Sequence, residues 1–273
     1  MTIYACLRQM AESYGAKTAI RFDGMPISYD ELFAQIDRTA DALLSAGIGE
    51  DDIVLADLPT IPQETWETFY STLFSTLLAL AIGLPLGVLL VVGEKKSICP
   101  MPGWFMKLLN GLINLLRSIP FLILMIIVIP LSRLIVGTSI GTRASIVPLV
   151  IASFPFVSRL VETSIREVDA GVIEAAQSMG ANPMQIILKV MIPESLPSLI
   201  ANATIAATTI LGYGAMAGVI GGGGLGKVAI NYGYYRYNFI LEIFATALLV
   251  VLVQLFQSVG TRLAARCDKR LRK

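Results

Sequence analysis

The chain has 273 residues, of which 55% are hydrophobic and only 15% charged, and its mean hydropathy is +0.71. Because an ordinary soluble domain has roughly 25% charged residues, this composition argues against a simple water-soluble protein. The sequence has no histidine and three widely separated cysteines, which excludes Ser-His-Asp and Cys-His catalysis and histidine-ligated metals and gives no reason to expect a metal or cofactor.

Residues 1–68 differ in charge from the rest of the chain. They contain 12 of the 20 Asp and Glu residues beside four Lys and Arg residues, so they carry −8, whereas residues 69–273 carry +9. Such a split indicates two pieces suited to different environments. The predicted organisation is a small α/β soluble fragment at 1–58, a junction at 59–68, a membrane domain at 69–262 and a basic cytoplasmic tail at 263–273.

The first fragment begins with the pattern of a β-hairpin followed by a helix. Strands are predicted at Ala19–Phe22 and Met25–Ile27, joined by a turn at Asp23-Gly24. A capping box over Ser28–Glu31 then begins a helix that runs to about Ser45.

Gly47 ends this helix, and Ile53–Ala56 has the composition of a further strand. The whole pattern resembles the N-terminal end of adenylate-forming (AMP-binding) enzymes. It includes none of that family's phosphate-binding loop or catalytic residues, so the resemblance implies no activity. Since so short a fragment rarely folds alone, a recombined reading frame is preferred to a working sensor domain.

Five apolar stretches are long enough to cross a membrane as helices. A hydrocarbon core about 30 Å thick needs about 20 mostly apolar residues, because backbone polar groups must pair within the segment. The second stretch contains Arg117, so a surface helix over Trp104–Leu116 is an equally good interpretation there. The five spans are about Phe69–Val92, Leu112–Leu131, Ala144–Val161, Leu196–Val219 and Phe239–Val259.

Small residues predict that these helices approach one another closely. Gly83 and Gly87 are spaced by four residues in the first span, and the fourth contains the small-residue run Ala201–Thr209. Prolines within or beside the spans favour a packed bundle of bent helices.

Lys and Arg in the connections predict the orientation of the chain. Thirteen lie on the side that includes the C-terminal tail, and four lie on the other, at Arg133, Arg143, Lys227 and Arg236. The richer side is expected to be cytoplasmic. With five spans, the C-terminus is then inside and the N-terminus outside.

The connection between the third and fourth spans, Glu162–Leu196, begins with signals for a short helix. Asp169 is a suitable N-cap for a helix over Ala170–Met179. Gly180 then supplies the left-handed residue that commonly ends a helix.

A second short helix follows directly. Asn182 and Gln185 form a capping box around Pro183 at the first helical position, and Pro193 ends the unit. So small a pair of helices cannot bury its own apolar face and therefore needs a partner. That face consists of Val172, Ile173, Ala176, Met179, Ile186 and Ile187.

Glu174-Ala175-Ala176, Gly180 and the ending Val190–Pro193 resemble the Glu-Ala-Ala coupling loop of the membrane subunits of bacterial ABC importers, over residues 169–193. The usual ending is Ile-x-Leu-Pro, so Val190 and Ile192 are conservative departures. The resemblance implies that the loop docks onto a separate ATPase subunit, so that the chain itself is not an enzyme. The alternative is a solvated helical hairpin. The implied coupling residues are Glu174, Ala175, Ala176, Gly180, Asn182, Pro183, Val190 and Pro193.

A narrower resemblance covers residues 64–262. Four segments, at 117–121, 136–141, 178–186 and 232–237, resemble the permeases of methionine ABC importers. This implies an all-α fold with five spans, a homodimeric permease, two ATPase subunits, a substrate-binding lipoprotein and inward transport of D- or L-methionine across the bacterial inner membrane. Gly212–Gly218 also matches, with Gly214 where serine is usual, which implies Tyr213, Gly214 and Met216 as pathway-lining residues.

Gly221–Val228 approximates a phosphate-binding loop, G-x-x-x-x-G-K-[ST]. No strand is predicted before it, and Val228 lacks the hydroxyl that holds magnesium. We therefore interpret the segment as a tight, flexible connector. The basic tail is interpreted as a flank that contacts membrane lipid rather than nucleic acid.

Three alternative functions remain open. The coupling loop defines the class but not the solute, so another small-solute ABC importer fits. An ion-coupled secondary transporter would need an intramembrane carboxylate pair, and only Glu242 is available. A membrane-anchored acyl-activating enzyme would need residues that the first fragment lacks.

Overall fold

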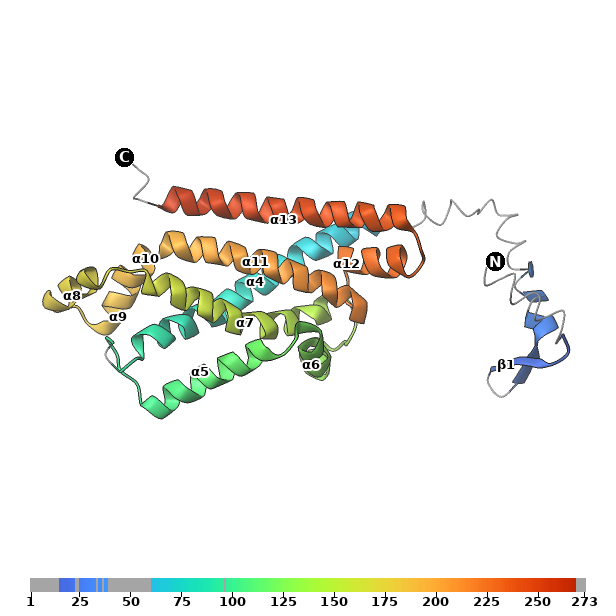
Figure 1. The fold of residues 1–273 in the computed structure, drawn as a ribbon, viewed down its shortest axis with the longest axis horizontal. Coiled ribbons are helices and arrows are strands. Elements are labelled where there is room, and N and C mark those ends of the chain that lie inside the picture. Colours follow the sequence, from blue (N-terminus) through green and yellow to red (C-terminus); the bar gives the residue numbers. More distant parts are fainter. Residues whose placement is uncertain are drawn as a thin grey trace. The chain divides into compact units, whose positions relative to one another are not determined.

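The computed structural model describes residues 15–22, 25–32, 34, 35, 37, 38, 60–95 and 97–268. The chain divides into two units, Met1–Pro59 and Thr60–Lys273. In the second unit four long helices pack into a bundle (Figure 1). They are α4 (Ile61–Val92), α7 (Thr142–Arg166), α11 (Leu196–Ala217) and α13 (Phe239–Cys267).

The described part of the first unit contains a two-stranded antiparallel sheet. Strands β1 (Thr18–Phe22) and β2 (Met25–Ser28) pair with Phe22 opposite Met25. The Ser28 N–H donates to Glu31 Oε2 at 3.1 Å, and the Glu31 N–H donates to Ser28 Oγ at 3.3 Å, which is the geometry of a capping box.

The predicted helix is present over its described part, since residues 29–32, 34, 35, 37 and 38 are helical. Its continuation as far as Ser45, the stop at Gly47 and the strand Ile53–Ala56 lie outside the described residues. A folded α/β domain over 1–58 is not supported, because the described residues show only the hairpin and the start of the helix.

Helix α4 begins earlier than the predicted span and includes most of the predicted junction. Pro62 occupies the first turn, where its missing N–H needs no partner. Glu64 and Glu67 consequently belong to the membrane unit. Divided at Thr60, the sequence carries −6 before the boundary and +7 after it.

The predicted second span, Leu112–Leu131, is wrong as a continuous helix. Helices α5 (Gly103–Ser118) and α6 (Phe121–Val136) meet at an angle of 108°. Pro120 causes the break, because it lacks an N–H and forces the preceding residue into extended backbone. Trp104–Leu116 lies within α5, so the helix of the alternative interpretation is present, here as the first half of the bent pair. The described residues thus contain four helices that could each cross a membrane, or five spans if the bent pair counts as one.

The predicted close approach at Gly83 and Gly87 is confirmed. A Cβ atom on Gly83 would lie 2.6 Å from a methyl group of Val157. A Cβ atom on Gly87 would lie 2.6 Å from the carbonyl oxygen of Ser158. Both glycines therefore allow α4 to pack directly on the backbone of α7.

Substituting Gly87 tests this contact. Gly87→Ala should destabilise the protein by about 1–3 kcal/mol, because the obstructing atom belongs to a helix backbone and cannot rotate away. The measurement is the apparent Tm of the detergent-purified protein, recorded as the temperature at which its monodisperse chromatography peak is lost. Gly111→Ala on α5 is the matched control, since nothing lies within 4 Å of its Cβ position. Equal Tm values for the two variants would contradict the packing argument.

Candidate functional site

The connection between α7 and α11 folds as the capping residues predicted. Helix α8 (Ala170–Ser178) begins at Asp169, whose carboxylate accepts a hydrogen bond from the Gly171 N–H at 2.7 Å. Gly180 has a φ of +79°, the left-handed conformation that ends the helix and turns the chain.

The second helix, α9 (Pro183–Ile186), begins with the predicted capping box. The Gln185 N–H donates to Asn182 Oδ1 at 2.9 Å, and the Asn182 N–H donates to Gln185 Oε1 at 3.0 Å. The unit does not end at Pro193, however. A π-helical turn, η2 (Ile187–Met191), and α10 (Ile192–Glu194) carry it on to Ser195. Pro193 is tolerated because it lies in the first turn of α10.

The apolar face of this unit is divided between the protein core and the surface. Ala176 and Ile186 are only 4% and 1% exposed, and Ile173 and Ile187 pack beside them. Met179 and Met184 are 82% and 62% exposed. The prediction that the whole face awaits a partner is thus wrong for its inner half, which packs against α4 and α7.

The eight residues that the resemblance implies for coupling also differ in their exposure. Ala176 is buried and Val190 half-buried, so both attach the unit to the bundle. The remaining six are exposed: Glu174, Ala175, Gly180, Asn182, Pro183 and Pro193. We call these six exposed residues, together with Met179 and Met184, the coupling surface.

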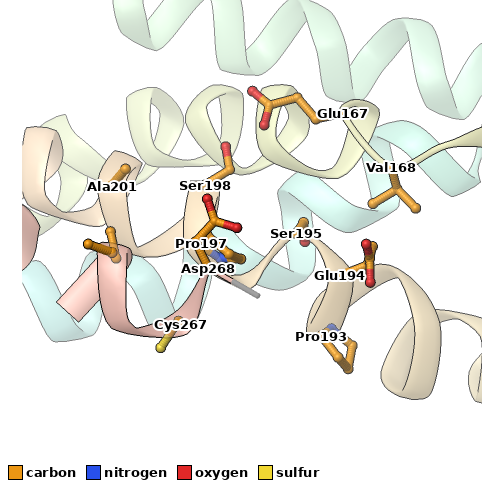
Figure 2. A pocket seen from close by; sticks show the side chains of 12 residues that line it. Glu167, Val168, Pro193, Glu194, Ser195, Pro197, Ser198, Ala201, Cys267 and Asp268 are labelled. Carbon is orange, nitrogen blue, oxygen red and sulfur yellow. The ribbon is translucent and has the colours of Figure 1, made fainter. Parts of the chain in front are cut away.

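A cavity of about 370 Å³ lies where the coupling unit joins α11 (Figure 2). Glu167, Glu194 and Asp268 line it, together with Ser195 and Ser198. The link between α10 and α11 therefore borders open space on the side of α13. No signal in the sequence pointed to this cavity, because its walls come from three separate segments.

Tyr213 stacks on Phe121, with ring centroids 4.5 Å apart and planes 7° from parallel. The two rings line a cavity of about 160 Å³. Gly214 and Met216 do not line this cavity. No atom lies within 4 Å of a Cβ placed on Gly214. A serine, which is usual at this position in the methionine importer permeases, would therefore meet no steric obstacle.

The glycine-rich segment that approximates a phosphate-binding loop is anchored to α4. It contains α12 (Leu225–Lys227) and leads into the π-helical segment η4 (Val228–Tyr234). Glu64, only 6% exposed, accepts hydrogen bonds from the Gly224 N–H at 2.7 Å and from Lys227 Nζ at 2.8 Å. The Leu225 N–H donates to Thr68 Oγ1 at 2.8 Å. We call this set of contacts the glycine-loop clasp.

The prediction of a flexible connector is therefore wrong. The hydrogen bond with Glu64 raises the pKa of Lys227 above its usual value, so the lysine stays charged. Thr142, at the start of α7, donates to the neighbouring carboxylate of Glu67. The clasp lies at the end of the bundle opposite α8 and α9 (Figure 1).

Comparisons with known proteins agree with this architecture. Residues 83–273 match the family described as "Binding-protein-dependent transport system inner membrane component". The "Probable D-methionine transport system permease protein MetI" of Vibrio cholerae is 47% identical over 207 residues, covering 76% of this chain and 91% of that protein. The "Methionine import system permease protein MetP" of Bacillus subtilis is 47% identical over 218 residues, covering 78% of this chain and 96% of that protein.

A solved structure, an inward-facing conformation of the MetNI methionine ABC transporter, matches with a TM-score of 0.76 and 42% identity. This match covers 78% of this chain and 99% of the matched chain. These matches and the helical bundle identify a multi-pass inner-membrane permease component, the membrane subunit of a transporter and not itself an enzyme. The chain belongs to the family of methionine ABC transporter permeases.

Gly180 offers a test of the coupling surface. Its Cβ position is open, so a substitution acts through backbone strain and not through a clash. Gly180→Val should reorient α9 and lower co-purification of an ATPase subunit at least fivefold, because a β-branched residue disfavours positive φ by about 1–2 kcal/mol or more. Gly180→Asn is the matched control, since asparagine tolerates this conformation. Similar co-purification by both variants would refute the role of the turn.

Proposed function

We propose that this chain is the membrane-spanning subunit of an ATP-driven importer that moves D- or L-methionine into the cytoplasm. The supporting observations are its membership of the permease family and the methionine-transport names of relatives that are 47% identical to it. The observation that carries the proposal is the coupling surface, an exposed patch joined to the bundle through the buried side chains of Ala176 and Ile186.

In this proposal a separate ATPase subunit binds the coupling surface and hydrolyses ATP. Met179 and Met184 supply an exposed apolar contact, and methionine side chains adapt well to a partner's surface. Ala176 and Ile186 are buried against the core, so a displacement of the surface is transmitted to α4 and α7 as the movement of one rigid body. The chain's own glycine-rich loop is filled by the carboxylate of Glu64, which supports assigning ATP to the partner.

The proposed assembly contains two copies of the permease, two ATPase subunits and an extracytoplasmic substrate-binding lipoprotein. The match to the MetNI transporter structure supports the ATPase subunits and the second permease copy. The cytoplasmic side is assigned from the Lys and Arg residues of the α4–α5 connection, the coupling unit and the C-terminal tail. The N-terminus and the glycine-loop clasp are then extracytoplasmic.

The carboxylates give little support to ion-coupled transport. Glu242 lies in the first turn of α13, at the end of that helix. Glu64 is buried but hydrogen-bonded to Lys227 and to the glycine loop. Neither residue therefore provides an ionisable pair at the centre of a span.

Transport by reconstituted vesicles tests the proposed function. Proteoliposomes containing this chain and its ATPase subunit should accumulate radiolabelled methionine only when ATP reaches the coupling-surface side. Met184→Glu should reduce uptake at least tenfold because it places a charge in the docking contact, whereas Met184→Leu should retain most of it. Uptake driven by a proton gradient without the ATPase subunit would contradict the proposal.

Cysteine labelling tests the proposed orientation. Cys99 is exposed in the connection between α4 and α5. In a variant that retains only this cysteine, a membrane-impermeant maleimide should label inverted vesicles and leave right-side-out vesicles unlabelled. Thr138→Cys, introduced into a cysteine-free chain between α6 and α7, should give the opposite pattern. Labelling of Cys99 from outside would reverse the assignment.

A further inference from the structure

The break between α5 and α6 borders the aromatic cavity of about 160 Å³. Arg117 and Ile119 line it from the break, Phe121 from the start of α6, Phe156 from α7 and Tyr213 from α11. Three segments far apart in the sequence therefore converge on one small chamber. Its volume is below the roughly 300–1,000 Å³ of sites for drug-sized ligands, so it suits a small solute.

Arg117 brings a positive charge to this chamber. No hydrogen bond or ion pair holds its guanidinium among the described residues. By contrast, Arg159 pairs with Glu162 at 2.6 Å, and Arg166 pairs with Glu94 at 2.6 Å. A charged side chain in a spanning segment is costly without a partner, so such a residue commonly marks a path for solute or ions.

The backbone at the break adds polar groups of both signs. Ile119 and Pro120 have extended backbone between the two helices. The last carbonyl groups of α5 and the first N–H groups of α6 have no partner within their own helices. At membrane depth such backbone is tolerated where it lines a cavity or is buried in protein. In transporters, broken helices of this kind bind the charged ends of small solutes.

We propose that this chamber binds a zwitterionic amino acid with an unbranched apolar side chain. The carboxylate of the ligand lies at the Arg117 guanidinium, and its ammonium group lies near the carbonyl end of α5. Its side chain packs against the aromatic rings of Phe121, Phe156 and Tyr213, where a thioether makes favourable contacts. This inference rests on the proposed function and deepens it, because it assigns a substrate site to named residues.

Direct binding tests the site. The full chain, assembled with its ATPase subunit in nanodiscs without nucleotide, is titrated with radiolabelled L-methionine. Arg117→Gln should raise Kd at least tenfold and Phe121→Ala at least fivefold. Arg117→Lys and Tyr213→Phe should bind within about threefold of the original protein, because they keep the charge and the ring stack. Arg133→Gln, which changes an arginine at the opposite end of α6, is the control and should leave Kd unchanged.

Competition experiments test the shape of the site. Norleucine, which replaces the sulfur atom with a methylene group, should compete about as well as methionine. Alanine should compete weakly because it leaves the rings uncovered, and tryptophan should compete weakly because it exceeds the chamber. Equal competition by all three amino acids would overturn the assignment.

The outcomes separate this inference from the proposed function. If the original protein transports methionine but Arg117→Gln and Phe121→Ala leave Kd unchanged, or if it binds no methionine, the site is overturned while the function stands. If the original protein binds methionine with the expected variant pattern but does not transport it, the site is supported and the proposed transport function is contradicted. If it neither binds nor transports methionine, both are overturned.

Discussion

Backbone hydrogen bonding in hydrocarbon is the constraint on which this structure depends. Each N–H and C=O group at membrane depth must find a partner within the protein, which is why the long apolar segments of α4, α7, α11 and α13 are helical throughout. The same constraint makes the interruption at Ile119–Pro120 informative. A break is tolerated where its polar groups face a cavity, and here Ile119 lines a chamber with an unpaired arginine beside it.

The α4–α7 pair connects the two ends of the molecule. At one end, Glu64 and Thr68 of α4 hold the glycine loop. At the other, Val88, Val92 and Ile165 share a buried core with Ala176 and Ile186 of the coupling unit. Gly83 and Gly87 lie between these ends and bring the two helices into backbone contact. The packed α4–α7 pair thus runs continuously from the core beneath the coupling unit to the glycine-loop clasp.

Features that depend on neighbouring residues could be predicted from the sequence. The caps at Asp169 and Asn182 and the turn at Gly180 are set by side chains within three residues, and four of the five spans follow from composition. The Glu64–Lys227 contact joins residues separated by 163 positions, and no local pattern pairs them. The hairpin over Thr18–Ser28, like the caps, follows from local pattern, because its two strands are adjacent in the sequence.

The resemblance of Gly221–Val228 to a phosphate-binding loop has a physical basis in the structure. Such loops bind anions because glycine lets successive backbone N–H groups point at one negative oxygen while a lysine adds charge. Here the Gly224 N–H and Lys227 Nζ donate to the two carboxylate oxygens of Glu64, and the adjacent Leu225 N–H donates to Thr68. One backbone N–H and the lysine of the motif thus bind an anion that the chain itself supplies, and the next N–H is taken up by a threonine hydroxyl.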